Sequence, residues 1–225
     1  TLLPYTTLFR SKGVSMLFAD VIGFSDLARN EPPIELVNKL NNYFYIFDEI
    51  VEQFGLEKIK TIGDCHMCAG GIPEGDPHNP IKTVLAGLKI QQTVQRLKGS
   101  FNSNLSEFKF RLGIHTGEVV AGVVGKNKFL YDIWGDAVNI AYQIVEAGEE
   151  DRVNISEQTY SIVKDYFFFT ERGNVLTKRN IPIKMHFVDK LLPRFAADKT
   201  GILPNEELLN ILEIGKTPKV THKAL

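Results

Sequence analysis

The sequence has little of several features that define common classes of protein. Its 225 residues carry 26 lysines and arginines against 27 aspartates and glutamates, so the net charge of -1 gives no reason to expect a nucleic acid polymer as a partner. No apolar run approaches the roughly 18 residues that a membrane-spanning helix needs. No secretory signal peptide is recognisable either. We therefore expect no membrane contact by this chain.

Cysteine is also scarce. The only two, Cys65 and Cys68, stand in the stretch C-H-M-C. A C-x-x-C pair is typical of a redox motif or of half a zinc site, but there is no second pair to complete a zinc site. In a strand, an offset of three places two side chains on opposite faces. We therefore interpret both as core thiols, and reduced thiols are typical of a cytoplasmic protein.

What the sequence does contain is two apolar segments that each end in an acid. M-L-F-A-D ends in Asp20, and Gly23 soon after it permits a tight bend. I-K-T-I-G-D ends in Asp64. Magnesium takes a few carboxylates together with phosphate oxygens, and two cations can flank an in-line displacement at phosphorus. Two acids at two strand ends therefore predict a two-cation phosphate site.

The periodicity of apolar residues predicts a mixed order of strands and helices. We expect strands at 14–19, up to 62, 65–69, 108–117, 118–125, 131–135, 152–156, 167–172 and 183–189, and helices at 32–55, 80–97, 136–146, 156–164 and 206–213. A break at Thr116 and Gly117 separates two of these strands, residues 99–106 form a polar loop, and Ser25 is placed to cap a helical turn. The plan is α+β, a ferredoxin-like β-α-β-β-α-β unit with additional C-terminal β-α-β elements.

The same reading divides the chain into three parts. Residues 1–13 read as a leader or linker, residues 14–190 as one folded domain, and residues 191–225 as a tail with a short helix. Hydrophobic residues make up 44% of the chain, which is enough for a packed core. Because the first residue is Thr1, we expect a piece of a longer protein, with room for an upstream sensor or membrane domain.

Five motifs together resemble the catalytic domains of class III adenylyl and guanylyl cyclases. They are F-A-D-V-I-G-F-S, K-T-I-G-D, R-L-G-I-H-T-G, Y-D-I-W-G-D and V-N-I-A, in the family's order and spacing. The resemblance covers roughly residues 14–190. It implies a cyclase homology domain that acts in signal transduction as a lyase, converting a nucleoside triphosphate to a cyclic nucleotide and pyrophosphate.

The resemblance assigns the two acids to metal binding. Asp20 and Asp64 match the family's metal-binding aspartates, and the carbonyl group of Ile22 matches a further ligand. The expected cofactors are two Mg²⁺ or Mn²⁺ ions per site. One lowers the pKa of the ribose 3′-hydroxyl, which attacks the α-phosphorus, and the other braces the triphosphate.

The resemblance also assigns the base-reading pair to Lys60 and Asp132. Adenine presents an acceptor at N1 and an amino donor at N6, so a lysine that donates and an aspartate that accepts fit adenine. Guanine presents the reverse pattern, and both protein groups would be mismatched. We therefore expect the substrate to be ATP.

Other matched residues are expected to hold the phosphates and the ribose. Arg111 and Lys178 match cations on the triphosphate, although the chain has K-R-N-I where the family shows K-G-K-G, so Arg179 can supply a second charge. Asn139 matches the asparagine that orients the ribose. The turn of Ile22, Gly23, Phe24 and Ser25 is expected to bind substrate, because its backbone N–H groups can meet phosphate oxygens.

One residue departs from the family's pattern. Four residues after Asn139, the family places an arginine that neutralises charge in the transition state, and this chain has Gln143. Glutamine donates hydrogen bonds but carries no charge. The chain is therefore a slow enzyme, an enzyme in which another cation stands in, or one that has lost catalysis. His115 is read as a packed histidine and not as a base.

The positions of the matched residues imply two chains. Lys60 and Asp64 are only four residues apart, an offset that brings base and metals too close together for one ATP. In the family, two domains pair head to tail, one giving the metal ligands and the other the base and ribose contacts. We therefore expect a homodimer with two equivalent sites.

Two alternatives of other kinds stay open at this point. The first is a degenerate cyclase domain that binds nucleotide and signals without turnover, which Gln143 favours. Two acids kept close together argue against it, because like charges are costly without a metal. The second is an enzyme like the diguanylate cyclases, but their G-G-D/E-E-F signature is absent.

Overall fold

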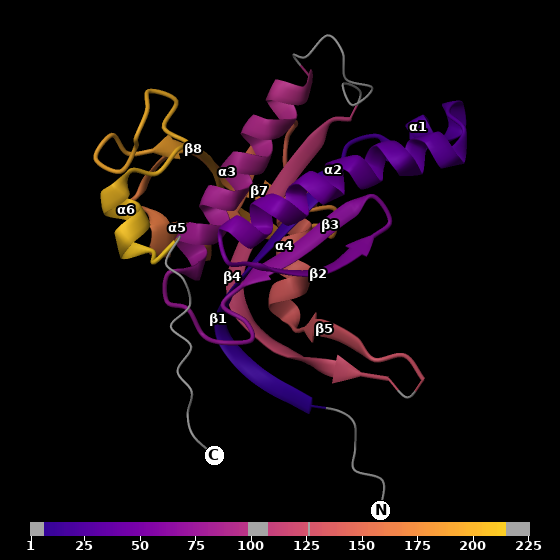
Figure 1. Cartoon of the computed structure of the whole chain (residues 1–225), viewed down its shortest axis with the longest axis horizontal. Coiled ribbons are helices and arrows are strands. Elements are labelled where there is room, and N and C mark those ends of the chain that lie inside the picture. Colours follow the sequence, from indigo (N-terminus) through magenta and orange to yellow (C-terminus); the bar gives the residue numbers. More distant parts are fainter. Residues whose placement is uncertain (1–6, 99–107, 126, 215–225) are drawn as a thin grey trace, which may run out of the picture.

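The computed structural model describes residues 7–98, 108–125 and 127–214. They form one mixed eight-stranded sheet in the order β2-β3-β1-β4-β6-β8-β7, with β5 paired to β4 off this path (Figure 1). The strands are β1 (Thr7–Val21), β2 (Glu57–Ile62), β3 (Cys65–Gly70), β4 (Phe110–Val124), β5 (Leu130–Trp134), β6 (Val153–Ser156), β7 (Phe167–Leu176) and β8 (Pro182–Leu191). The helices are α1 (Phe24–Asn30), α2 (Pro33–Gln53), α3 (Asn79–Lys98), α4 (Asp136–Glu146), α5 (Glu157–Val163) and α6 (Glu206–Ile211).

The first half of the chain forms the predicted ferredoxin-like unit. β1, α2, β2, β3, α3 and β4 follow one another as β-α-β-β-α-β, with the short α1 before α2. β1 lies between β3 and β4 and is antiparallel to both. Its apolar residues between Val14 and Val21 are buried because helices cover both faces of this part of the sheet. The strand therefore holds Asp20, near its end, in the middle of the sheet.

Apolar side chains pack on both faces of the sheet. On one face, Phe47 of α2 packs in the same cluster as Leu17 and Cys68. On the other face, the cluster under α4 contains Phe18 and Cys65. This alternation follows from the pleat of a strand. It confirms the interpretation of the cysteines, which are both buried and unpaired.

The second half of the chain extends the sheet beyond β4. β6 runs parallel to β4, and β8 and β7 follow as antiparallel neighbours. The hydroxyl group of Ser156 accepts a hydrogen bond from the backbone N–H of Thr159, which confirms the predicted cap of α5. After β8 the chain folds back, and Phe195, Leu208 and Leu212 are buried in the cluster that contains α2 and α3. The predicted tail is therefore part of the core as far as residue 214.

Two predicted boundaries are wrong, for one reason. β1 begins at Thr7 inside the predicted leader, and β4 continues through Thr116 and Gly117 without a break. The two strands pair along almost their whole length, with one register shift between Ser11 and Val14. Pairing with a long partner keeps a segment extended even where its own pattern of apolar residues is weak.

Smaller differences concern the ends of elements. Ser25 lies inside α1 and does not cap it, because the helix begins at Phe24 and its N-cap is Gly23, with φ of 73°. Only glycine adopts that backbone conformation without strain. The predicted loop at 99–106 lies outside the described residues. None of the described helices has both the length and the apolar character needed to cross a membrane.

Candidate active site

Asp20 is the most constrained of the predicted site residues. It lies in register with Cys65 of β3 on one side and Arg111 of β4 on the other. Its Oδ2 atom accepts hydrogen bonds from Nε of Arg111 at 2.8 Å and from Nη2 at 2.5 Å. Although it lies at the end of its strand, Asp20 is only 6% exposed. A carboxylate this deeply buried needs a charged partner, and Arg111 is that partner.

Asp64 lies in the turn between β2 and β3, after Gly63. Burial raises the pKa of the Asp64 carboxyl group, and the negative charge of Asp20 raises it further, while its own backbone N–H group and Arg111 oppose the rise. Asp64 directly precedes Cys65, which is in register with Asp20, so the two carboxylates lie at the same end of neighbouring strands. The structure therefore brings together Asp20, Asp64 and Arg111.

The donors at this end of the sheet fit Mg²⁺ or Mn²⁺. Asp20 and Asp64 offer the hard oxygen ligands that magnesium takes, and a cation would relieve their repulsion. Within the described ranges, no group of three or more His, Cys, Asp or Glu side chains is placed to hold a metal ion by itself. Burial raises the pKa of the neighbouring Cys65 thiol, and Mg²⁺ and Mn²⁺ prefer oxygen ligands to sulfur. Two carboxylates without further side-chain ligands suit an ion whose remaining ligands are phosphate oxygens.

The predicted phosphate-binding turn lies directly after Asp20. The backbone N–H of Ile22 donates a hydrogen bond of 2.7 Å to the carbonyl group of Lys109, the residue before β4. Gly23 and Ser25 are exposed, and Phe24 is half-buried against Phe108. The backbone of this turn is therefore anchored at one end and open to solvent at its tip.

Lys60 and Asp132 lie together, as expected of a base-reading pair. The Nζ atom of Lys60, on β2, lies 2.6 Å from Oδ2 of Asp132, on β5. The other oxygen of Asp132 accepts a hydrogen bond of 2.8 Å from the backbone N–H of Ile133. The side chains are 40% and 19% exposed. A donor and an acceptor are thus fixed side by side at the surface.

An irregularity in β2 sets the direction of Lys60. The ladder with β3 shifts register between Lys58 and Lys60. Lys58 reaches Asp48 of α2 at 2.6 Å, whereas Lys60 reaches Asp132. In a regular strand, residues two apart point to the same face, and a bulge re-aims a side chain. The shift therefore separates a structural lysine from a candidate base-reading lysine.

Asn139 and Gln143 lie one turn apart on α4 but have different surroundings. Asn139 is exposed, whereas Gln143 is buried and only 6% exposed. The Nε2 atom of Gln143 donates a weak hydrogen bond of 3.4 Å to the carbonyl group of Asn139, and its Oε1 atom is buried without a hydrogen-bond partner. The side chain of Gln143 thus buries a hydrogen-bond acceptor that has no partner, which costs free energy of folding.

Gln143 borders a cavity of about 390 Å³ between α4, α5 and β8. His115 also lines this cavity, with its Nδ1 atom 2.8 Å from the hydroxyl group of Ser156. Burial lowers the pKa of His115 to about 4, against an opposing effect of Asp136. The imidazole is therefore neutral near pH 7, in keeping with a packed histidine.

Lys178 lies in the turn between β7 and β8. Its Nζ atom is 2.6 Å from Oε1 of Glu146, near the end of α4, and its side chain is 66% exposed. An ion pair this exposed is weak, so Lys178 is free to exchange Glu146 for another anion. Asn180, two residues on, has φ of 58°, so the turn is tight even without the glycines that the family shows there.

The predicted residues thus form separate groups. Asp20, Asp64 and Arg111 form one, and Lys60 with Asp132 forms another, and within the described residues no hydrogen bond or ion pair joins the two. The Arg111–Asp20 ion pair was not predicted. The sequence does contain a signal for this ion pair, because Asp20 and Arg111 each stand near the end of a largely apolar strand.

Comparisons with known proteins identify the family of this chain. The family model described as adenylate and guanylate cyclase catalytic domain matches residues 8–190. An adenylate cyclase from Mycobacterium tuberculosis is 37% identical over 164 residues, which cover 73% of this chain and 36% of that protein. A membrane guanylyl cyclase from Dictyostelium discoideum is 34% identical over 182 residues, which cover 80% of this chain and 12% of that protein. The chain therefore spans well under half the length of these curated relatives.

Solved structures agree as well. The adenylyl cyclase CyaB from P. aeruginosa has a TM-score of 0.72 at 27% identity, over 81% of this chain and 95% of that one. The guanylate cyclase domain of RhGC from Catenaria anguillulae, solved with GTP, has a TM-score of 0.73 at 24% identity, over 80% of this chain and 97% of that one, and supports the fold. Relatives of both nucleotide specificities are thus present. The chain belongs to the adenylate and guanylate cyclase catalytic domain family.

Proposed function

We propose that the chain converts ATP to 3′,5′-cyclic AMP and pyrophosphate at sites shared between two copies of itself. The observation that carries the choice of ATP is the 2.6 Å contact between Lys60 and Asp132. The ammonium group offers a donor to adenine N1, and the carboxylate offers an acceptor to the N6 amino group. Guanine would meet a donor with its own N1–H and an acceptor with its O6.

In this proposal, Asp20, Asp64 and Arg111 act on the phosphates. Asp20 and Asp64 would hold two Mg²⁺ or Mn²⁺ ions, which when bound would supply positive charge to the triphosphate and lower the pKa of the 3′-hydroxyl group. Arg111 already neutralises Asp20, with one nitrogen 2.5 Å from its carboxylate. If bound cations neutralised Asp20 instead, the guanidinium group of Arg111 would be free to bind a phosphate oxygen in the bidentate geometry that it favours.

Residues of the partner copy complete each site. Asn139 is exposed on α4, where its amide group can orient the ribose. Lys178, and Arg179 beside it, stand in an exposed turn and can bind the outgoing pyrophosphate. Two copies are supported by a group of exposed apolar side chains on β1, β4, β5 and the loop before β5, namely Leu8, Val120, Phe129, Leu130 and Trp134. Such a patch is typical of a surface that another protein covers.

The first prediction concerns the base. We expect kcat/KM for ATP to exceed that for GTP by at least about 100-fold, because a mismatched polar pair is left without partners. The double variant Lys60→Glu, Asp132→Cys should erode this ratio. Lys58→Glu is the matched control, since Lys58 pairs with Asp48 away from Asp132, and it should leave the ratio unchanged. Steady-state kinetics with both nucleotides and Mn²⁺ provide the measurement, and equal use of GTP by the unmodified protein would refute the assignment.

The second prediction concerns the missing arginine. Arginines that stabilise phosphoryl transfer contribute roughly 10³ to 10⁵ in rate, and a single neutral donor about 10² to 10³. We therefore expect a slow enzyme in which Gln143→Arg raises kcat by at least about tenfold and leaves KM nearly unchanged, because the charge acts in the transition state. Gln143→Met is the control for packing and should not raise kcat.

One result would contradict this prediction about Gln143. If Gln143→Arg lowers kcat while the dimer stays intact, residue 143 does not face the reacting phosphate. The burial of Gln143 and its unpaired Oε1 atom make this a stringent test, because the arginine has to extend out of the cavity. Lys178 or Arg179 would then be the better candidate for the missing charge.

A second candidate function rests on the same residue. With a neutral, buried Gln143 in place of an arginine, the domain would bind nucleotide and transmit a signal without turnover. Retention of both Asp20 and Asp64 in one site favours the active enzyme. For either function, the free thiols of Cys65 and Cys68 support a cytoplasmic location.

A further inference from the structure

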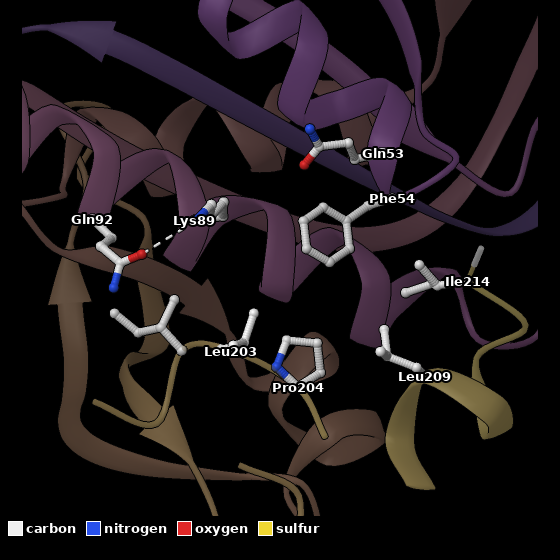
Figure 2. A pocket seen from close by; sticks show the side chains of 9 residues that line it. Gln53, Phe54, Lys89, Gln92, Leu203, Pro204, Leu209 and Ile214 are labelled. Carbon is white, nitrogen blue, oxygen red and sulfur yellow. Dashed lines mark hydrogen bonds between the residues drawn. The ribbon is translucent and has the colours of Figure 1, made fainter. Parts of the chain in front are cut away.

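A cavity of about 350 Å³ lies on the side of the molecule where α2 and α3 meet the C-terminal segment (Figure 2). One wall comes from the end of α2 and from α3. The other comes from residues 202–214, which include α6. The family match ends at residue 190, so the second wall lies beyond the matched domain. The cavity is therefore independent of the nucleotide site proposed above.

The cavity has an apolar end and a polar end. Figure 2 shows Phe54, Pro204, Leu209 and Ile214 on one side, with Lys89 and Gln92 on the other. Phe54 is 8% exposed and Pro204 is buried, so these two are fixed parts of the wall. Apolar walls with a few polar groups that fix orientation are typical of small-molecule sites in this range of volume.

Lys89 differs from the other lysines of α3. Lys82 forms an ion pair with Asp76 at 2.7 Å, and Lys98 forms one with Asp151 at 2.9 Å. The Nζ atom of Lys89 has only a long contact of 3.4 Å with Oε1 of Gln92, and among the described residues it has no carboxylate partner. A half-buried lysine that lacks a carboxylate partner in the described part of the chain, at the rim of an apolar cavity, favours a ligand that carries one negative charge.

We propose that this cavity binds a single-chain carboxylic acid, with its hydrocarbon tail between Phe54 and Leu209 and its carboxylate on the ammonium group of Lys89. Burial of the hydrocarbon tail against the apolar end of the cavity would favour binding. A single cation matches a single charge, and the amide N–H group of Gln92 can donate a second hydrogen bond to the carboxylate. Bound acid would also hold residues 202–214 against α2 and α3.

Isothermal titration calorimetry of the whole chain with decanoate tests this proposal. Decanoate should bind with a stoichiometry of one per chain. Decanol, which keeps the tail but loses the charge, and Lys89→Met protein with decanoate should each bind at least about tenfold more weakly, because a charge-assisted hydrogen bond is lost. Lys164→Met, a change of an exposed lysine at the end of α5, should leave the affinity for decanoate unchanged.

Two further variants locate the binding site. Leu209→Trp fills the apolar end, and Gln53→Trp blocks the rim from an exposed position at the end of α2, so that the test survives if one variant folds poorly. Either folded variant should abolish binding. Equal affinity for decanoate and decanol, an unchanged affinity in Lys89→Met, or decanoate binding that persists in a folded tryptophan variant would overturn the proposal.

Discussion

Replacing Asp20 or Asp64 with alanine is expected to reduce cyclic nucleotide formation to background, because each loss removes an anchor for a cation. The two variants should differ in stability. Asp64 lies in a turn, so Asp64→Ala should fold almost normally. Asp20→Ala leaves the guanidinium group of Arg111, whose side chain is only 20% exposed, without its acid. We expect that to cost about 1 to 3 kcal/mol of unfolding free energy.

A conservative variant separates these effects. Asp20→Asn keeps an oxygen that can accept from Arg111 but loses the charge that holds a cation, so it should be more stable than Asp20→Ala and equally inactive. Asp26→Ala, an exposed acid on α1, is the control and should keep full activity. Product formation with Mn²⁺ and thermal unfolding supply the two readouts. Substantial turnover by folded Asp64→Ala protein would show that the two acids do not form a metal site.

Most of the fold could be predicted from the sequence, because it depends on local patterns. The apolar period of α2, the glycine turn before Asp64 and the Ser156 cap each act within a few residues. The predictions from sequence were wrong where pairing between strands far apart in the chain determines the structure. The beginning of β1 at Thr7 and the unbroken course of β4 depend on a long antiparallel ladder, whose partners are about 100 residues apart. No local signal at Gly117 reveals that partner.

The candidate site divides in a similar way. Motif spacing identified Asp20, Asp64 and Lys60, and the structure adds how they are held. It pairs Asp20 with Arg111 and turns Lys60 away from Lys58 through a register shift, and neither follows from residue types. The buried position of Gln143 could not be predicted either, because the face that it occupies depends on how α4 packs against β4. The roles of all these residues in catalysis stay predictions.

The second large effect is expected from mixing two inactive proteins. Asp20→Ala chains lack a metal ligand, and Asn139→Ala chains lack the ribose contact. In the proposed head-to-tail dimer, a heterodimer has one site that loses both residues and one site that keeps both. Purified heterodimers should therefore recover about half of the unmodified activity, one of two equivalent sites.

The control for this experiment uses two variants of the same half-site. Asp20→Ala and Asp64→Ala chains, co-purified as a heterodimer, have a damaged metal half in every site, so the mixture should stay inactive. Recovery in this control would mean that Asp20 and Asp64 serve different sites. The design thus distinguishes a composite site from a general rescue of folding by a partner chain.

The measurement that tests the central claim most directly is cyclic AMP formation by the purified Asp20→Ala with Asn139→Ala heterodimer, with Mn²⁺ and ATP, beside its two parent homodimers. A composite site shared between two copies predicts inactive parents and a heterodimer with about half of the unmodified rate. A heterodimer that is shown to form and is no more active than its parents would contradict the shared site.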